Sequence, residues 1–434
     1  MPCLTILQVG KSILEYQLIF ETMRKIYSLI LAFLATVSDV QAQQHEILDD
    51  RIATLQVVAG NDWLSPPVIV LGSDTPINIS FDDLTHEYHR YAYRIEHCEA
   101  DWSPSDEIFP SDYCDGFTEG NAIDDITESI NTNVLYTHYS FQLPNSRCRM
   151  KIGGNYKVTI YDENNDKDVV TACFMVVEPE MSVAASVTTN TDIDVNRAHQ
   201  QVSMSLNYGG IKITNPQTEI KTVVMQNGRW DNAAVNPSPQ YITPDGLGWK
   251  HNRQLIFKGG NEYRKFEVLD VSHTTMGLES ISWDGKNYNA FVWTDDPRPS
   301  YVYDEDANGS FYIRNSNNIE NDYSSEYVYV HFRLKTPMSY GDIYLNGIWT
   351  NDRPLPQYKM VFNAQTRCYE KAVLLKQGYY SYQYLLLCSD GSLSPLPSEG
   401  NFCYTENKYQ CLVYYRGLGQ RTDRLFGYVQ IKAN

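Results

Sequence analysis

The sequence predicts an all-β protein built as tandem β-sandwich domains. Apolar and polar residues alternate with a period of two in many short segments, such as 156–161 and 327–334, and this period places successive side chains on opposite faces of a strand. The 33 tyrosines fit the same class, because tyrosine favours strands and half-buried faces. Dipeptides that favour positive φ angles separate the apolar segments, as tight hairpin turns require. They are Gly153-Gly154, Asn227-Gly228, Asp284-Gly285, Asn346-Gly347 and Asp390-Gly391.

The first element along the chain is a predicted secretory leader. Arg24 and Lys25 precede the apolar run 26–35, and Val40-Gln41-Ala42 supplies small residues where signal peptidase cleaves. We interpret 1–42 as a start-site extension followed by a signal peptide that is cleaved near Ala42. An uncleaved anchor is the alternative, although the apolar run is short for a bilayer span. The leader predicts an exported protein.

Three β-rich domains are predicted to follow the leader. We expect them at 43–178, 181–318 and 323–434. Glu178-Pro179-Glu180 marks the first boundary, and the polar run 315–322 is typical of a linker. Segments 341–347 and 378–384 resemble an immunoglobulin-like early-set domain of the kind found in glycogen-binding modules, so the third domain is expected to have that fold.

Composition excludes several classes of protein. The chain has 434 residues, of which 42% are hydrophobic, enough to build a core in each domain. It carries 53 acidic and 35 basic residues, a net charge of -18. The leader contains three residues of each sign, so the mature charge is the same. Such a charge repels nucleic acid and anionic lipid, and it favours a basic partner surface.

Eight cysteines remain after Cys3 is lost with the leader. An even number in an oxidising compartment permits disulfides, but large sandwich domains also bury free thiols as small hydrophobic residues, and both possibilities stay open. Cys368 and Cys388 flank the Gln377-Gly378 turn and form the first pair to test. No CxxC motif predicts a zinc ribbon or a thioredoxin-type site. The eight are Cys98, Cys114, Cys148, Cys173, Cys368, Cys388, Cys403 and Cys411.

Two segments have residues that could bind metal. Asp304-Glu305-Asp306-Ala307-Asn308-Gly309 begins like a calcium loop, but Asn315 stands where the bidentate glutamate should close it, so a solvated turn is expected. His86 and His89 are three residues apart, where the helical zinc motif needs four, and alternation here suggests a strand. We therefore expect no metal site.

Paired acidic residues raise the question of a glycosidase. Such an enzyme needs two carboxyl groups about 5–10 Å apart, which a sequence does not supply. Neighbouring carboxylates on a strand point to opposite faces, so solvated loops or turn caps are the expected setting. No nucleophile elbow, Walker loop or dinucleotide motif is present, so we expect no catalytic residue and no cofactor. The pairs are Asp82-Asp83, Asp124-Asp125 and Asp295-Asp296.

The last stretch of the chain, 399–431, has the most specific motifs. They are Glu399-Gly400-Asn401-Phe402, Thr405-Glu406-Asn407, Val413-Tyr414-Tyr415-Arg416, Arg421, Asp423-Arg424-Leu425 and Gly427-Tyr428. Together these motifs closely resemble the C-terminal segment of the plug protein of the type IX secretion system, a periplasmic component of certain Gram-negative bacteria.

The resemblance extends over nearly the whole mature chain. Further matching segments are Phe81-Asp82-Asp83-Leu84, His97-Cys98 with Ala100-Asp101-Trp102, Thr137-His138-Tyr139, Phe174-Met175-Val176-Val177-Glu178-Pro179, Asn207-Tyr208-Gly209-Gly210, Gln226-Asn227-Gly228-Arg229-Trp230-Asp231-Asn232 and Gly259-Gly260-Asn261-Glu262-Tyr263-Arg264. What the resemblance implies is a non-enzymatic subunit that docks on the periplasmic mouth of the outer-membrane translocon barrel and seals its pore. It implies a location at the periplasmic face of that membrane, without small-molecule substrate. It assigns no interface residue.

Two other functions remain as alternatives. Exposed tryptophans near the first hairpin of glycogen-binding modules stack on sugar rings, and Trp349 follows Asn346-Gly347 in a comparable place. A secreted carbohydrate-binding protein is therefore the main alternative, although only one aromatic residue is in register and a structural or docking role is favoured. A surface glycosidase is the weaker alternative.

Overall fold

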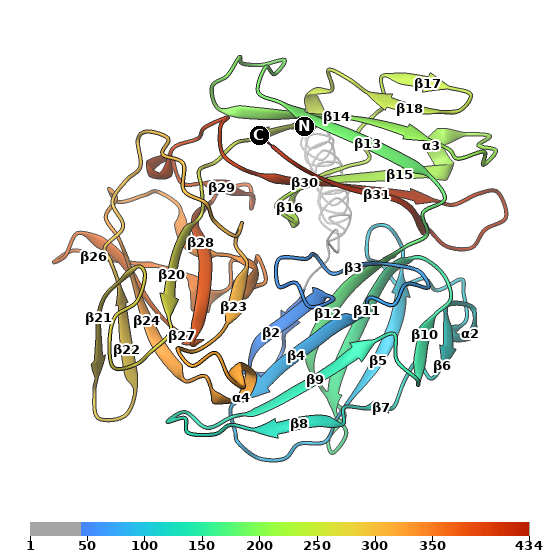
Figure 1. Cartoon of the computed structure of the whole chain (residues 1–434). Coiled ribbons are helices and arrows are strands. Elements are labelled where there is room, and N and C mark those ends of the chain that lie inside the picture. Colours follow the sequence, from blue (N-terminus) through green and yellow to red (C-terminus); the bar gives the residue numbers. More distant parts are fainter. Residues whose placement is uncertain (1–44, 434) are drawn as a thin grey trace, which may run out of the picture. The chain divides into compact units, whose positions relative to one another are not determined.

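The computed structural model describes residues 45–433, and this part of the chain is all-β, as the sequence predicts (Figure 1). The predicted leader, with its cleavage site near Ala42, lies outside the described residues. Among the described residues, no helix has the length and apolar character needed to cross a membrane. The strands form three sandwiches, which are named here by their order along the chain.

The first sandwich packs two sheets around one core. Aromatic residues such as Phe81, Tyr139 and Tyr156 fill that core with β-branched residues, and every second side chain of these strands points into it. One sheet has the order β1 (Glu46–Ile47), β12 (Lys167–Val177), β11 (Gly154–Asp162), β5 (Tyr91–Cys98), β7 (Asn121–Ala122), with β3 (Val68–Val70) beside β12. The other has the order β2 (Ile52–Ala59), β4 (Ile77–Asp83), β9 (Thr137–Leu143), β8 (Asp125–Glu128). A ribbon of β6 (Cys114–Gly116) and β10 (Cys148–Met150) follows the short α2 (Pro110–Tyr113).

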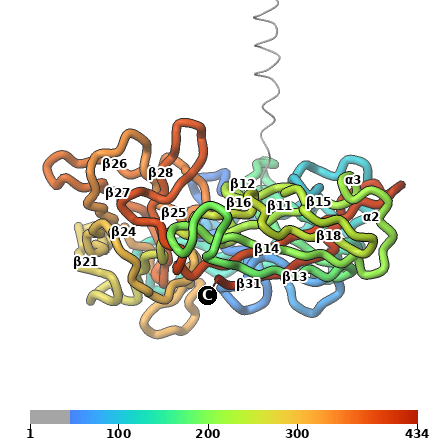
Figure 2. The backbone as a smooth tube through the Cα atoms, turned by 90° about the horizontal axis from the view of Figure 1, so that it is seen from above, coloured from blue at the N-terminus to red at the C-terminus, as the bar shows by residue number. Residues whose placement is uncertain are grey.

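The second sandwich combines the middle of the chain with its C-terminal end. One sheet has the order β13 (Ser182–Thr188), β14 (His199–Asn207), β18 (Gly246–Trp249), β17 (Tyr241–Thr243), with β19 (Ile256–Lys258) beside β14. The other has the order β16 (Arg229–Val235), β15 (Ile220–Gln226), β30 (Lys408–Tyr415), β31 (Arg424–Lys432). The short α3 (Pro216–Glu219) and η1 (Arg253–Leu255) connect these strands. Figure 2 shows the red strand β31 next to the green β13, which it contacts.

The third sandwich lies between β19 and β30 in the sequence. One sheet joins β20 (Arg264–Val268), β28 (Gly378–Leu387), β23 (Phe311–Ile313), β25 (Asp342–Asn346) and β29 (Leu393–Pro395), all paired with β28. The other has the order β21 (Leu278–Trp283), β22 (Tyr288–Val292), β24 (Tyr327–Leu334), β27 (Cys368–Lys376), β26 (Val361–Asn363). The connections hold α4 (Asn321–Ser324), η2 (Ile348–Thr350), η3 (Pro356–Tyr358) and η4 (Pro397–Glu399).

Strand pairing crosses the boundary that the sequence suggests near 318–323. β15 pairs with β30, β20 with β28 and β22 with β24, so the ranges 181–318 and 323–434 share three sheets. Hydrogen bonding between strands and burial of their apolar faces set these pairs, and neither depends on chain order. The division into 43–178, 181–318 and 323–434 stays a prediction, as does the immunoglobulin-like detail.

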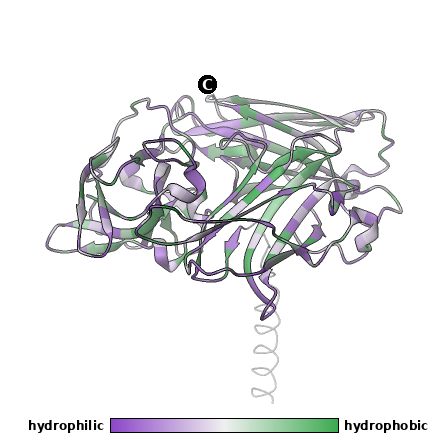
Figure 3. Cartoon of the chain, turned by 60° about the horizontal axis from the view of Figure 1, so that its bottom comes forward, coloured by the Kyte–Doolittle hydropathy of each residue, from purple (hydrophilic) through white to green (hydrophobic). Residues whose placement is uncertain are grey.

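The sheet of β12 is buried on both faces. One face packs into the core of the first sandwich, while Cys173, Met175 and Val177 pack against Val223 and Leu412 of the second. Burial on both faces explains why 169–177 is almost continuously apolar and shows little alternation. Figure 3 shows the hydrophobic residues concentrated on strands, with hydrophilic residues in the connecting loops.

Candidate functional site

Residues of the C-terminal motifs lie at contacts between the sandwiches. Glu399, at the end of η4, accepts hydrogen bonds from Arg264 (Nη2 to Oε1, 2.8 Å) and Arg298 (Nη2 to Oε2, 2.7 Å). Only 5% of its side chain is exposed. Asn401 Oδ1 accepts a 2.7 Å bond from the backbone N–H of Gly260. These bonds fix the third sandwich to the segment that leads back into the second.

The next motif residues form a buried polar network. Asn407 Nδ2 donates to Gln200 Oε1 (3.0 Å) and to the Gly259 carbonyl (2.8 Å). Tyr414, on β30, donates its hydroxyl to Asn155 Oδ1 on β11 (2.8 Å), which joins the second sandwich to the first. Buried polar groups carry a desolvation penalty unless they are bonded, so each pair holds its two strands in one arrangement.

Ionic contacts continue this joint along β31. Arg424 Nε donates to Oε1 of Glu178, the residue that follows β12 (2.8 Å). Asp423, 1% exposed, pairs with Lys221 on β15 (2.7 Å) and accepts from the backbone N–H of Ala100 (3.1 Å). The polar motif residues therefore lie where two sandwiches meet, and their spacing in the sequence reflects the path of β30 and β31.

A second joint connects the first and third sandwiches. Asp82, at the end of β4, pairs with Lys376 at the end of β27 (2.6 Å), and both side chains are at most 1% exposed. His138 Nδ1 lies 2.7 Å from Asp82 Oδ1, and the Tyr327 hydroxyl donates to Asp82 Oδ2 (2.6 Å). Lys376 Nζ also lies 4.1 Å from the centre of the Tyr136 ring.

Charge and burial oppose each other at this pair. Burial lowers the pKa of Lys376. Burial would raise the pKa of Asp82, but Lys376 and His138 outweigh it and hold that pKa below its usual value. Removing one partner would leave an uncompensated buried charge, so the first and third sandwiches cannot separate here without a large penalty.

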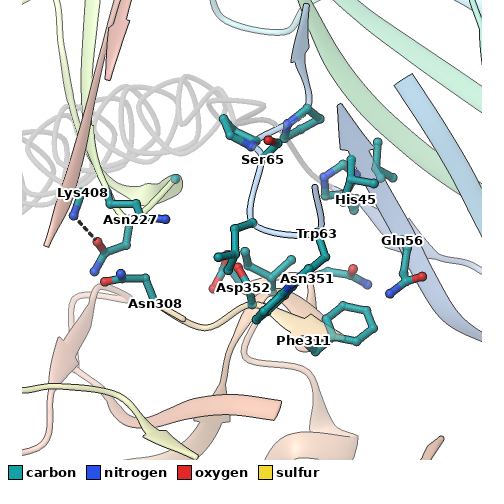
Figure 4. Close-up of a pocket in the computed structure, with 18 of the residues that line it drawn as sticks. His45, Gln56, Trp63, Ser65, Asn227, Asn308, Phe311, Asn351, Asp352 and Lys408 are labelled. Atoms are coloured by element: carbon teal, nitrogen blue, oxygen red, sulfur yellow. Dashed lines mark hydrogen bonds between the residues drawn. The ribbon is translucent and has the colours of Figure 1, made fainter. Parts of the chain in front are cut away.

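A cavity of about 230 Å³ lies where the three sandwiches meet (Figure 4). Burial raises the pKa of Asp352 to about 6 and lowers that of His45 to about 4. The cavity contains side chains that both donate and accept hydrogen bonds, and it contains aromatic rings. Among its lining residues are Gln56, Trp63, Asn227, Asn308, Asn351 and Asp352.

The two candidate metal segments use their side chains in local contacts. Asp306 accepts from the backbone N–H of Asn308 (2.6 Å) and of Tyr263, and Asp304 pairs with Lys265 (2.6 Å). His86 and His89 lie in the loop between β4 and β5, so the expected strand at this point is wrong. His86 has a φ of 53°, which ends the extended conformation. Residues 45–433 contain no group of three or more His, Cys, Asp or Glu that could hold a metal ion.

The acidic pairs have three different settings. Asp82 and Asp83 point to opposite sides, as expected on a strand, but both are fully buried, so the expected solvated or capping position is wrong for Asp82. Asp295 accepts from Arg264 and from the hydroxyls of Tyr382 and Tyr384. Asp124-Asp125 is exposed. Tertiary partners, which have no local sequence pattern, bury the first of these pairs.

Trp349 lies in the core of the third sandwich. It is 7% exposed, its ring meets those of Phe332, Tyr358 and Tyr380, and its indole N–H donates to the Ser381 carbonyl (3.0 Å). Its ring faces are therefore not available to stack on a sugar, and the carbohydrate alternative loses the residue on which it was based.

All eight cysteines of residues 45–433 are free thiols in this structure. Cys368 lies on β27 and Cys388 follows β28, in different sheets, and each contacts a nearby backbone carbonyl of its own segment. Two other cysteines, Cys114 and Cys148, have their sulfur atoms 3.0 Å apart. Sequence spacing did not indicate this pair.

The sequence also gave no signal for Lys376 as a buried cation. It ends an apolar strand and precedes a turn, a position where a lysine is usually solvated. Its partner Asp82 lies 294 residues earlier, so only the tertiary structure reveals the pair.

Comparison with known proteins gives two findings. The family model described as "Type 9 secretion system plug protein 1st domain" matches residues 52–178, which is the first sandwich. The crystal structure of a hypothetical protein from Parabacteroides merdae is 42% identical, with a TM-score of 0.87, and the match covers 90% of this chain and 99% of that one.

Two further solved structures have the low TM-scores of 0.16 and 0.14 and 8% identity, so no argument rests on them. They are C-terminal domains of antigen I/II-family proteins from Streptococcus pyogenes and Streptococcus agalactiae; each match covers 90% of this chain, with 99% and 97% of theirs. No curated protein matches the chain.

Proposed function

The chain belongs to the plug protein family of the type IX secretion system, and from this premise we propose that it docks on the periplasmic mouth of the outer-membrane translocon and seals the pore when no substrate occupies it. Membership indicates a role in type IX secretion and association with an outer-membrane component of that system. We propose in addition that the leader is cleaved near Ala42 and that the mature protein is periplasmic.

The observation that carries the proposal is the set of buried joints between the sandwiches. A seal must resist displacement by solutes and substrate, so its parts must keep one arrangement. Asp82–Lys376, Tyr414–Asn155 and the bond from the Ala100 backbone N–H to Asp423 each join two different sandwiches through buried groups. Separating them would expose buried groups to solvent or leave a buried charge without its partner. A body held in this way loses little conformational entropy when it binds.

The surface charge supports reversible docking. A net charge of -18 favours a basic partner surface and speeds association through long-range attraction. A plug must leave during export, so we expect a contact with a polar rim and a modest apolar core. Salt should therefore slow docking.

The family and the all-β fold favour a structural role over catalysis. The carboxylates considered for a glycosidase, Asp82 and Asp295, are engaged by Lys376, Arg264 and tyrosine hydroxyls. We assign the protein no catalytic role and no cofactor.

Affinity purification from solubilised envelopes tests the proposal. The mature protein, tagged ahead of His45, should recover the translocon barrel, with less recovery at high salt. A folded protein that recovers no translocon component would contradict docking. Deletion of the gene should raise envelope permeability to large antibiotics, because an open pore would remain; unchanged permeability would contradict sealing.

A further inference from the structure

The cavity at the meeting point of the sandwiches has hydrogen-bonding groups without partners. The side-chain amides of Gln56, Asn308 and Asn351 line it, and none makes a side-chain hydrogen bond with another described residue. Each amide offers two donors and an acceptor. Amide groups that face a cavity and remain unpartnered suit a ligand that both donates and accepts hydrogen bonds.

Trp63 gives the cavity a fixed aromatic wall. Its ring stacks on Tyr312 with 5.5 Å between centroids and meets the edge of Tyr379 at 5.7 Å. Figure 4 shows Trp63 beside Asn351, Asp352 and Phe311. A ring that is held by neighbours loses little freedom when a flat apolar face stacks on it.

Most charged side chains around the cavity have a partner, and Lys408 is a lining cation whose side chain has none among the described residues. Asp231 pairs with Arg229 (2.5 Å), and Glu46 pairs with Arg353 (2.5 Å). Asp352 accepts a bond from Asn346. A phosphate would need a group of free cations, and a lipid chain would need an apolar lining. Lys408 alone is not such a group of cations, and a lipid chain would leave the amides and charges among the apolar lining residues without hydrogen bonds.

We propose that the cavity binds a small neutral saccharide of one or two rings. Its volume of about 230 Å³ is below the roughly 300–1,000 Å³ of pockets for drug-sized ligands, which limits the ligand to that size. Sugar hydroxyls pair with Gln56, Asn308 and Asn351, and the C–H face of a sugar ring stacks on Trp63. The site goes beyond the sealing role and does not depend on it.

Titration of the mature protein with a panel of neutral mono- and disaccharides tests the site, by saturation-transfer NMR and tryptophan fluorescence. At least one sugar should bind, and Trp63→Ala and Asn351→Ala should each weaken it by about tenfold or more. Inorganic phosphate should not compete. Trp293→Ala is the matched control, because Trp293 is 58% exposed and does not line the cavity.

Two results would overturn the proposal: no sugar binds at millimolar concentration, or a sugar binds equally well to Trp63→Ala and Asn351→Ala. If a variant at Trp63 or Asn351 does not fold, Gln56→Ala serves in its place, because Gln56 lies on β2 and its side-chain amide has no partner among the described residues. Recovery of the translocon by these variants should be unchanged, so failure here is distinct from failure of the plug function.

A separate observation concerns Cys114 on β6 and Cys148 on β10. Their sulfur atoms lie 3.0 Å apart, and the residues are 3% and 0% exposed. The two strands approach closely: a Cβ at Gly116 would lie 2.1 Å from the Arg147 carbonyl oxygen. By contrast, Cys98 and Cys173 are too far apart to form a disulfide. They lie on β5 and β12 with β11 between them, about 10 Å apart at two strand spacings.

We infer that Cys114 and Cys148 form a disulfide in the exported protein, an inference that rests on the proposed periplasmic location. A dithiol–disulfide oxidase or oxidised glutathione supplies the oxidant. The Cys114 thiolate attacks the oxidant's disulfide and releases one thiol, and the Cys148 thiolate then attacks the Cys114 sulfur and releases the second. The two protons lost by the cysteines end on the two thiols released. Because both cysteines are buried, the bond forms before the ribbon closes.

Thiol counting under denaturing, non-reducing conditions tests this bond. Protein purified from the periplasm should have six alkylatable thiols, which is eight less the two joined, and a peptide pair linking Cys114 to Cys148. Protein made in a reducing cytoplasm is the control and should have eight. The double variant Cys114→Ala/Cys148→Ala should have six alkylatable thiols whether it is made in the periplasm or in a reducing cytoplasm. Eight thiols in the periplasmic protein would overturn the inference, even if it still recovers the translocon.

Discussion

Lys376 shows how single residues hold this molecule together. It is 1% exposed, and the carboxylate that neutralises it lies 294 residues earlier, at the end of β4. Tyr327 and His138 satisfy the other lone pairs of that carboxylate. A fully bonded buried pair adds little net stability, but losing one partner has a large effect.

Replacing Lys376 by methionine should therefore reduce the free energy of unfolding by about 3–5 kcal/mol, because Asp82 would stay buried and unpaired. Urea denaturation followed by circular dichroism measures the change. Lys335→Met is the matched control: its pair with Asp296 is 3.5 Å long and about 70% exposed on both sides, so its loss should change stability by less than about 1 kcal/mol. Equal effects of the two substitutions would contradict the buried joint.

Asp306 should make stability depend on pH. Burial raises its pKa to about 7 from the model-compound value of 3.8, so the folded state holds a proton that the unfolded state releases. Stability from this group is present in acid and is lost as the pH rises from about 4 through about 7. In Asp306→Asn, denaturation between pH 5 and pH 8 should show a smaller loss of stability than in the original protein. An identical loss would contradict the assignment.

For single residues, the sequence predicts the face of a strand on which a side chain lies better than it predicts whether that side chain is buried. The period of two places Asp82 and Asp83 on opposite sides of a strand, which is confirmed. Burial of Asp82 could not be predicted, because it depends on Lys376 and Tyr327. Trp349 illustrates the same limit: a tryptophan beside a turn can stack on a ligand or fill a core, and only its neighbours decide.

Among the elements, the C-terminal segment 399–431, called the tail below, packs closely on the chain near Gly259. A Cβ at Gly259 would lie 2.0 Å from the Phe402 carbonyl oxygen, and the Gly259 carbonyl accepts from Asn407. No side chain can be added there without moving the backbone of the motif segment. The alternating segments 156–161 and 327–334 predict β11 and β24. Local patterns of this kind do not show that the C-terminal segment returns to this place.

Gly259→Ala should therefore destabilise the protein by about 1–3 kcal/mol through overpacking. Gly248→Ala, on β18, is the control, because its added methyl group would lie 3.5 Å from Tyr241, an ordinary contact distance. That change should stay within about 0.5 kcal/mol. Denaturant titration of both variants gives the comparison, and a neutral Gly259→Ala would show that the tail is not tightly fitted.

In the whole molecule, the tail joins sandwiches that chain order would keep apart. β30 and β31 complete a sheet begun by β15, and the outer face of β12 packs on that sheet. The sequence predicts consecutive domains because local patterns mark strands and linkers, while the pairing of distant strands has no local pattern. The family resemblance of the C-terminal segment is specific, but it does not explain why polar residues such as Asn407 and Asp423 occupy their positions in that segment.

A buried apolar cluster, which includes Met175 of β12 and Leu412 of β30, joins the first and second sandwiches. We therefore expect these two sandwiches to unfold cooperatively. Trp102 and Trp230 meet across it with 5.6 Å between their ring centroids, so tryptophan fluorescence reports on the contact. Its unfolding transition in urea should coincide with the transition in far-ultraviolet circular dichroism. Two separated transitions would show that the sandwiches are only loosely joined.

The most direct test of the central proposal is the ionic conductance of the purified translocon in a planar bilayer. Adding the mature protein to the periplasmic side should close the open channel, and raising the salt concentration should slow that closure. A conductance that does not change when folded protein is added at saturating concentration would contradict the account of this protein as a plug.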